Sequence, residues 1–146
     1  MYKHILIPTD GSELSEKAID HGTKLAKALN AKITTVTVSE PFRIFAVNPT
    51  MLTDTPEEYK RRIAAASAKY IKAAKDTAAA AGVTCDGVHV EHENPYEAII
   101  DTARKTGCDA ILMASHGRRG VSAIVLGSET VKVLTHSTIP VVVVRA

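Results

Sequence analysis

Short apolar runs alternate with longer segments of helical periodicity from one end of the chain to the other. The run 4–8 (HILIP) is apolar at nearly every position, which is typical of a strand covered on both faces. In the segment 12–29, apolar residues instead recur every three or four positions, which predicts an amphipathic helix. The same distinction predicts strands at 4–8, 32–38, 83–91, 109–114 and 140–145, and helices at 12–29, 55–81, 94–107 and 128–136.

The strict alternation of these strands and helices favours the α/β class. Strands separated by helices form parallel sheets through right-handed crossovers, and the helices then cover both faces. We therefore expect a single domain, residues 1–146, built on an open five-stranded parallel sheet of the Rossmann-like or flavodoxin-like kind. Neither an internal repeat nor an interdomain linker interrupts the pattern.

Two of the predicted helices begin with a capping sequence. Thr55, Pro56 and Glu58 supply an N-cap hydroxyl, a proline in the first turn and the carboxylate of a capping box. Asn94, Pro95 and Glu97 repeat the same order of residue types. The sequence therefore predicts that the side chain of Asn94 caps its helix.

The stretch 39–55 fits neither pattern and is longer than most connections between elements. It contains both phenylalanines of the chain, Phe42 and Phe45. Two interpretations stay open: the stretch covers a pocket or a partner surface, or it folds back on its own domain.

Composition and charge narrow the class of protein. The chain has 146 residues, 45% of them hydrophobic, and a mean hydropathy of +0.02, as expected of a folded domain. Apolar runs fall far short of the roughly 20 residues of a membrane-spanning helix, and no signal peptide is recognisable, so we expect a cytoplasmic protein without membrane association. A net charge of +2 and a pI of about 8.6 are too weakly basic to indicate nucleic-acid binding. Cys85 and Cys108 lack the spacing of a zinc or redox motif.

Residues that directly follow the strands are the first candidates for chemistry, because open α/β sheets bind ligands at the carboxyl ends of their strands. Asp10 follows the first strand, where it either reaches a ligand or only serves the turn and the helix dipole. His116 follows the fourth strand, where it either orients a ligand or forms a local hydrogen bond. The histidines show no metal-binding spacing, and the chain has no GxSxG motif. Catalysis of the ordinary hydrolase kind is therefore not expected.

The segment 114–130 has the character of an anion-binding loop. Gly117 permits a tight bend of the backbone. Gly127 and Ser128 open a helix whose first amides are unpaired and carry partial positive charge. Arg118 either adds charge or is simply solvated. The Walker pattern is not matched, since no GK[ST] follows, but a phosphate group is a reasonable ligand for this loop.

Both ends of the chain resemble one known family. The opening KHILIPTDGSELSEKAI and the closing DAILMASHGRRGVSAIVLGSETVKVLTHSTIPVVVVR resemble the universal stress protein family, and the order of elements between them agrees. The resemblance implies one universal stress protein domain over residues 1–146 with strand order 3-2-1-4-5. In that order the first and fourth strands are neighbours, so Asp10 and the glycine loop face each other.

Family members that bind ATP are similar to one another in a G-x2-G-x9-G-[S/T] motif after the fourth strand. Gly117, Gly127 and Ser128 match this motif, whereas Ala114 stands in place of its first glycine. The resemblance implies ATP as the ligand, with Mg²⁺ bound through phosphate oxygens. The binding residues that it implies are Asp10 and Val38 at adenine, Pro8 and Ala114 at ribose, Gly117, Arg118, Gly127, Ser128 and Glu129 at the phosphates, and His116 within the same motif.

The last strand suggests an assembly. Val141 to Val144 are four consecutive β-branched residues at a sheet edge, and such an edge invites pairing with another chain. The resemblance implies an antiparallel homodimer through this strand, which would close the interface. The alternative is an edge covered by a loop of the same chain.

These observations lead to one preferred function and two alternatives. We expect an ATP-binding universal stress protein that acts as a nucleotide-dependent regulatory or signalling module, with at most slow ATP hydrolysis and a protein partner that the sequence does not identify. The first alternative is a family member that binds no nucleotide and acts as a dimeric interaction module. The second, a flavodoxin-like redox carrier, is disfavoured because few aromatic residues follow the strands.

Overall fold

The computed structural model describes residues 1–42, 55–117 and 126–145. The strands are β1 (His4–Pro8), β2 (Lys32–Ser39), β3 (Cys85–Glu91), β4 (Ala110–Ala114) and β5 (Val141–Val144). The helices are α1 (Glu13–Leu29), α3 (Pro56–Ala80), α4 (Pro95–Thr106) and α5 (Ser128–His136). Most of the irregular stretch 39–55, and Arg118, fall outside the described residues.

The predicted elements are present, with small shifts at their ends. The largest shift at a strand is in β3, which the sequence predicts from residue 83. Val83 instead belongs to the turn after α3, because its N–H donates to the carbonyl of Ala78 (2.9 Å). Its side chain is buried, which explains the apolar signal at this position.

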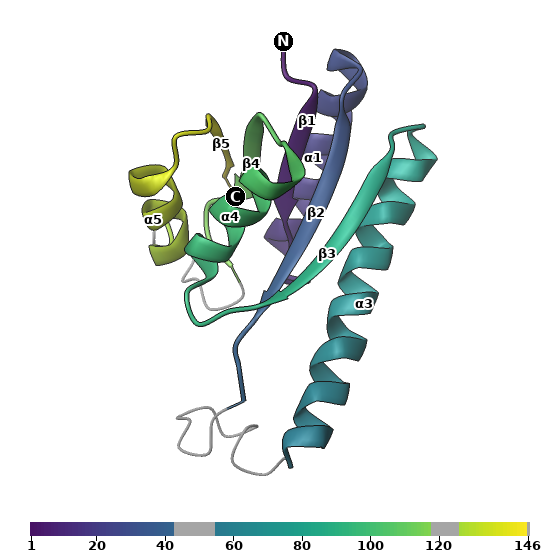
Figure 1. Ribbon diagram of the computed structural model, residues 1–146. Helices are drawn as coiled ribbons and strands as arrows, with labels where there is room; N and C mark the ends of the chain where they lie inside the picture. Colours follow the sequence, from purple (N-terminus) through teal and green to yellow (C-terminus); the bar gives the residue numbers. More distant parts are fainter. Residues whose placement is uncertain (43–54, 118–125, 146) are drawn as a thin grey trace.

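The described strands form one parallel sheet with the order β3-β2-β1-β4-β5 (Figure 1). This confirms the predicted fold class and strand order. β1 lies at the centre and pairs with β2 as far as Pro8↔Val36, and with β4 through Ile5↔Ala110. The chain winds outward from β1 in both directions, so the carboxyl ends of β1 and β4 are neighbours and β3 and β5 are the edges.

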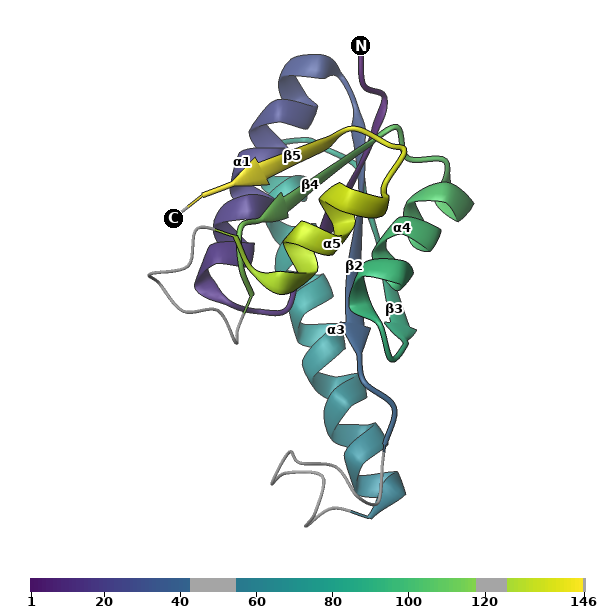
Figure 2. The ribbon, with the colours of Figure 1, turned by 90° about the vertical axis from the view of Figure 1, so that its left-hand side faces the viewer.

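Helices cover both faces of the sheet, with α1 and α3 on one face and α4 and α5 on the other (Figure 2). Side chains alternate between these faces along β1. Ile5 and Ile7 pack on the α1–α3 side, and Leu6 packs on the α4–α5 side. All three are fully buried, which explains why the first strand is apolar at consecutive positions.

Capping sequences fix the starts of two helices, and one predicted cap is wrong. Thr55 accepts a hydrogen bond from Glu58 N–H (3.1 Å), and the Glu58 carboxylate accepts one from Thr55 N–H (3.3 Å), so the predicted capping box is present. Ser12 caps α1 in a similar way through Ser15 N–H (3.2 Å). The side chain of Asn94 forms no capping hydrogen bond to α4. The acceptor for α4 comes from elsewhere in the fold, as described below.

Candidate functional site

The point where the strand order reverses brings three elements together. β1 ends at Pro8, the neighbouring β4 ends at Ala114, and α5 begins beside them because Gly127 N–H donates to the carbonyl of Ser115 (2.6 Å). We call this region, formed by the carboxyl ends of β1 and β4 and the first turn of α5, the switch point. Open α/β sheets bind their ligands at such a position.

Buried hydroxyl groups hold the turn after β1 in place. Thr9 N–H donates to the carbonyl of Val36 (2.9 Å), and the hydroxyl of Thr37 donates to the carbonyl of Thr9 (3.0 Å). The hydroxyl of Thr9 lies 3.2 Å from that of Ser15 in α1. The end of β1 is thereby joined to both β2 and α1. The sequence analysis did not single out Thr9 or Ser15, although hydroxyl side chains beside a strand end are the available signal.

Asp10 lies beside the loop that follows β4. Its Oδ1 accepts a hydrogen bond from Ser12 N–H (3.0 Å), and a Cβ built on Gly117 would come within 2.6 Å of its Oδ2. Gly11 has a left-handed backbone (φ +76°), and a side chain at this position would overlap the ring of Tyr70 in α3. The turn is therefore fixed on both sides of the carboxylate, and the structure brings Asp10 and Gly117 together.

Two residues at the end of β4 connect the switch point to the rest of the sheet. Ser115 N–H donates to the carbonyl of Val144 in β5 (2.8 Å). The buried hydroxyl of Thr130 in α5 donates to the carbonyl of Ala114 (3.0 Å). The methyl group of Ala114 belongs to the core on the α1–α3 side, so the residue that replaces the first glycine of the family motif packs with apolar neighbours. Ser115 and Thr130 lie in the segment that the sequence analysis singled out, but the pattern assigned neither of them a role.

Gly127 packs tightly against the residues that follow β4. A Cβ at Gly127 would come within 3.1 Å of the Cα of His116 and 3.3 Å of the carbonyl oxygen of Ser115. Its backbone conformation (φ −71°, ψ 161°) is one that any residue adopts. Close approach, and not backbone strain, therefore disfavours a side chain at this position.

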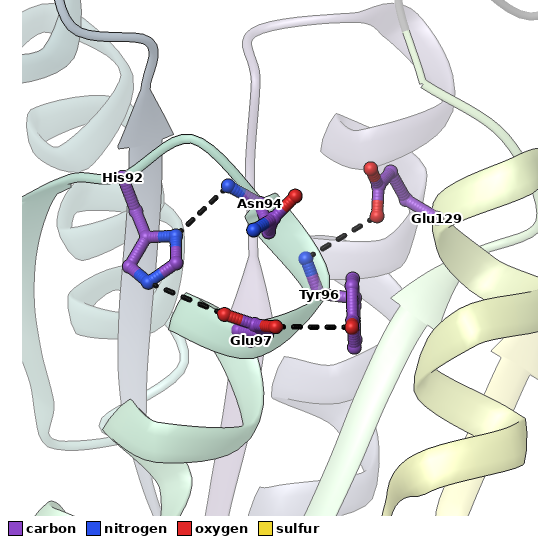
Figure 3. A network of polar contacts seen from close by, with 5 residues as sticks. All are labelled: His92, Asn94, Tyr96, Glu97 and Glu129. Carbon is purple, nitrogen blue, oxygen red and sulfur yellow. Dashed lines mark hydrogen bonds and ion pairs between the residues drawn. The ribbon is translucent and has the colours of Figure 1, made fainter.

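The carboxylate of Glu129 points away from the start of its own helix. Its Oε2 accepts a hydrogen bond from Tyr96 N–H in α4 (3.3 Å; Figure 3). Its Oε1 lies 3.9 Å from Nζ of Lys132. The backbone of Glu129 remains in the first turn of α5. Of the residues predicted to surround a phosphate, Glu129 thus contributes its amide to the switch point and its negative charge to α4.

Of the remaining predicted residues, the structure describes His116 and Val38 but not Arg118. Nδ1 of His116 lies 3.3 Å from the carbonyl oxygen of Gly117, which is the local hydrogen bond weighed as the alternative to a ligand role. Val38, near the end of β2, is half-buried and packs on the α4–α5 side of the sheet. Arg118 lies outside the described residues, so its predicted place at the phosphates stays a prediction.

The described residues hold neither a metal-binding cluster nor a membrane-spanning helix. Among residues 1–42, 55–117 and 126–145, no cluster of three histidine, cysteine or acidic side chains is placed to hold a metal ion. Within the same ranges, no helix combines the length and apolar character needed to span a membrane.

The sequence profile of the universal stress protein family matches residues 1–145. The chain belongs to this family. Among its relatives, the universal stress protein YxiE of Bacillus subtilis is 30% identical over 149 residues, which cover 99% of this chain and all of YxiE. The universal stress protein MJ0577 of Methanocaldococcus jannaschii is 31% identical over 159 residues, which cover 99% of this chain and 96% of MJ0577.

Solved structures of universal stress proteins share this fold. The structure of MJ0577, described as a hypothetical protein whose biochemical function was assigned from its structure, superposes with a TM-score of 0.83 at 29% identity, covering 100% of this chain and 97% of the other. A universal stress protein in complex with cAMP superposes with a TM-score of 0.72 at 28% identity, covering 98% and 97% of the two chains. Universal stress proteins with the same strand arrangement thus include one that binds an adenine nucleotide.

Proposed function

We propose that this universal stress protein binds ATP at the switch point and acts as a nucleotide-dependent regulatory module in the stress response, with at most slow ATP hydrolysis. One observation carries the proposal: α5 begins against the end of β4, and its N-cap residue, Gly127, has no side chain with which to cap the first amides. Uncapped amides at a helix N-terminus bind anions, and phosphates above all. The complex of a 28% identical relative with cAMP supports an adenine nucleotide as the ligand.

The residues of the switch point fit a ligand of this kind. Gly117 and Gly127 carry no side chains that would screen their backbone amides, so a phosphate chain can approach the backbone closely. The Ser128 hydroxyl is exposed at the first position of α5, where it would add a hydrogen bond to the phosphates. Asp10 and the backbone of Val38 would contact adenine, with Pro8 and Ala114 at the ribose.

Mg²⁺ would be held through the phosphates in this proposal. The described residues offer no three-ligand metal site, and Asp10 is engaged with Ser12 N–H through one of its oxygens. Magnesium commonly binds proteins through one or two carboxylates together with substrate phosphates. Because the chain would contribute positioning amides and no assigned general base, we propose that turnover is slow and that the bound state carries the function.

The test is calorimetric titration of nucleotide-free protein with ATP and Mg²⁺, with AMP and FMN as comparison ligands. We expect micromolar ATP binding. The variant Asp10→Asn should weaken ATP binding about tenfold, since a hydrogen bond to a charged group is lost. Asp20→Asn is the matched control, because Asp20 lies on the exposed side of α1, where it forms an ion pair with Lys24 (3.1 Å).

Three other outcomes would change this proposal. Absence of ATP binding at two temperatures would overturn the proposal and favour a dimeric interaction module that uses no nucleotide. Preferential binding of FMN would favour a redox carrier. ATP binding that Asp10→Asn leaves unchanged would remove Asp10 from the site while keeping the ligand.

We further propose that two copies pair through β5. Ser115 N–H donates to the carbonyl of Val144, and because a parallel ladder bonds alternate residues, Val143 directs its N–H and C=O away from β4. On the neighbouring α5, Val131 and Leu134 are 45% and 42% exposed, which is high for large apolar side chains. A paired β5 with these residues at its side would give a closed interface with an apolar margin.

Val143→Pro tests this assembly selectively. The substitution removes an outward N–H and leaves the ladder to β4 intact, so the monomer should fold and the dimer should be lost. Sedimentation velocity would measure the change, with Val143→Ala as the control for the lost side chain. A wild-type protein that is monomeric at high micromolar concentration would contradict the proposed dimer.

A further inference from the structure

The first turn of α4 receives its cap from α5. Pro95 has no N–H, and the two residues after Tyr96 donate to the carbonyl of Asn94 (3.1 and 3.3 Å). Tyr96 N–H is therefore the amide of this turn that still needs an acceptor, and the side chain of Asn94 does not supply one. The acceptor is the carboxylate of Glu129 at 3.3 Å, from a residue 33 positions further along the chain.

Other contacts between the two helices keep this turn on α5. The rings of Tyr96 and His136 lie 5.2 Å apart, and Nζ of Lys132 lies 5.7 Å from the centre of the Tyr96 ring. Lys132 is also 3.9 Å from the second carboxylate oxygen of Glu129. The first turn of α4 is thereby docked along α5 from Glu129 to His136.

Polar contacts continue from Tyr96 into the turn between β3 and α4 (Figure 3). The hydroxyl of Tyr96 donates to Oε1 of Glu97 (3.0 Å), and Oε2 of Glu97 lies 3.7 Å from Nε2 of His92. Nδ1 of His92 accepts a hydrogen bond from Asn94 N–H (2.8 Å). The backbone N–H of His92 donates to the carbonyl of Ser39 at the end of β2 (2.9 Å). The cap on α4 is thus the α5 end of a chain of contacts that reaches β2.

The carboxylate of Glu129 stands between two helix N-termini. A carboxylate in the first turn of a helix is stabilised by that helix's own amides, yet here it lies against the amide of Tyr96. A phosphate bound to the first amides of α5 would neutralise the partial positive charge at this helix end. It would also repel the carboxylate of Glu129. Both effects favour the contact with α4.

We propose that Glu129 transmits phosphate binding at α5 to α4, so that an anionic ligand tightens the cap on Tyr96 and orders the β3–α4 turn. This inference rests on the proposed nucleotide site and names the element that responds to it. Because coupling between two equilibria is reciprocal, loosening the cap changes phosphate affinity as well. The turn of residues 92–95 becomes the surface at which the bound state differs from the free state.

Amide hydrogen exchange of Tyr96, followed by NMR, measures the cap directly. In the wild-type protein we expect ATP to slow this exchange about twofold to fivefold, the range of charge interactions at helix ends, and adenosine to leave it unchanged. Glu129→Ala should accelerate exchange about fivefold without ligand, as loss of a cap does, and should abolish the response to ATP. Glu129→Gln keeps an acceptor but no charge, so its exchange without ligand should stay near the wild-type rate while its response to ATP shrinks.

Two controls belong to the experiment. The amide of Tyr59 occupies the first turn of α3, donates to the carbonyl of Thr55 (2.9 Å), and should not respond to ATP or to any Glu129 variant. Glu16→Ala removes an exposed first-turn carboxylate from α1 and should leave the exchange of Tyr96 unchanged.

Three results would overturn the inference, and they can be told apart. Equal Tyr96 exchange in wild type and Glu129→Ala would mean that the cap does not form in solution. Saturating ATP, verified by calorimetry on the same samples, that leaves Tyr96 unaffected would mean that the cap is structural only. If calorimetry shows no ATP binding, the proposed function and the coupling fail together, while the comparison without ligand still decides whether Glu129 caps α4.

Discussion

The carboxylate of Asp10 lies against the Cα of Gly117, so that a Cβ on Gly117 would come within 2.6 Å of Oδ2. Gly117 is exposed, and its φ lies outside the left-handed region, so its backbone tolerates a side chain. Gly117→Ala should therefore displace the carboxylate, lower ATP affinity about tenfold, and change the free energy of unfolding by less than about 0.5 kcal/mol. Calorimetric titration and urea unfolding measure the two effects.

A double-mutant cycle shows whether the carboxylate is the cause. In an Asp10→Ala background the added methyl group at Gly117 has nothing to displace, so the effect of Gly117→Ala on ATP affinity should vanish. An effect that persists in this background would assign the loss to the loop itself.

Gly127→Ala should act on stability as well as on binding. The new Cβ would meet the backbone of His116 at 3.1 Å and the carbonyl of Ser115 at 3.3 Å, so the loop must shift and the 2.6 Å hydrogen bond between Gly127 and Ser115 must lengthen. We expect a loss of about 1–2 kcal/mol in the free energy of unfolding, together with weaker ATP binding. Ser128→Ala, one residue further and exposed, is the control for stability. A wild-type melting temperature in Gly127→Ala would contradict the close approach described here.

Thr130→Val should destabilise the protein without changing its shape. The hydroxyl of Thr130 is buried and donates to the carbonyl of Ala114 (3.0 Å), so its removal should cost about 1–2 kcal/mol in urea unfolding. Thr135→Val is a matched control in the same helix, because the hydroxyl of Thr135 donates to the carbonyl of Val131 (2.8 Å) at an exposed position. Equal effects of the two variants would mean that the bond to β4 has no special weight.

Stability should fall as the pH drops below about 6.5, and His4 should be one cause. Burial lowers the pKa of His4 from its ordinary value of 6.5, and nearby Lys32 lowers it further. Below pH 6.5, His4 therefore binds a proton in the unfolded chain while it remains neutral in the folded protein. The free energy of unfolding then falls by up to about 1.4 kcal/mol per pH unit for this one proton. His4→Gln should flatten this part of the curve.

Asp109 should affect stability at a lower pH than His4, so the contributions of the two side chains can be measured separately. Burial raises the pKa of its carboxyl, but hydrogen bonds from the amides of Lys3 (2.9 Å) and His4 (3.1 Å) outweigh burial and lower it below 3.8. The stability that these bonds supply is present above pH 3.8 and is lost as the pH falls through the lowered pKa. Asp109→Asn should remove this acid limb and leave the slope near pH 6 in place.

Much of the fold follows from local pattern. Consecutive apolar residues in β1 predict a strand covered on both faces, and Ile5, Leu6 and Ile7 are indeed divided between two cores. The capping box of Thr55 and Glu58 is equally local, since both partners lie within one turn.

What the sequence could not predict depends on residues far apart in the chain. Asn94 has the composition of a cap, yet the acceptor for α4 is Glu129, which only the packing of α5 on α4 brings near. Ala114 departs from the family motif, and only the structure shows that its methyl group lies in the core. The position of Glu129 in the motif predicts where its backbone lies. It does not predict which residues the carboxylate of this flexible side chain contacts.

Ser115 is hydrogen-bonded through its backbone to both β5 and the start of α5. Its N–H donates to Val144 at the sheet edge, and its carbonyl accepts from Gly127 at the start of α5. A sideways movement of β5 is therefore felt one residue away at the amides of α5. In a dimer built on β5, the apparent ATP affinity would then depend on protein concentration, and a titration of dilute protein would report a different constant from one of concentrated protein.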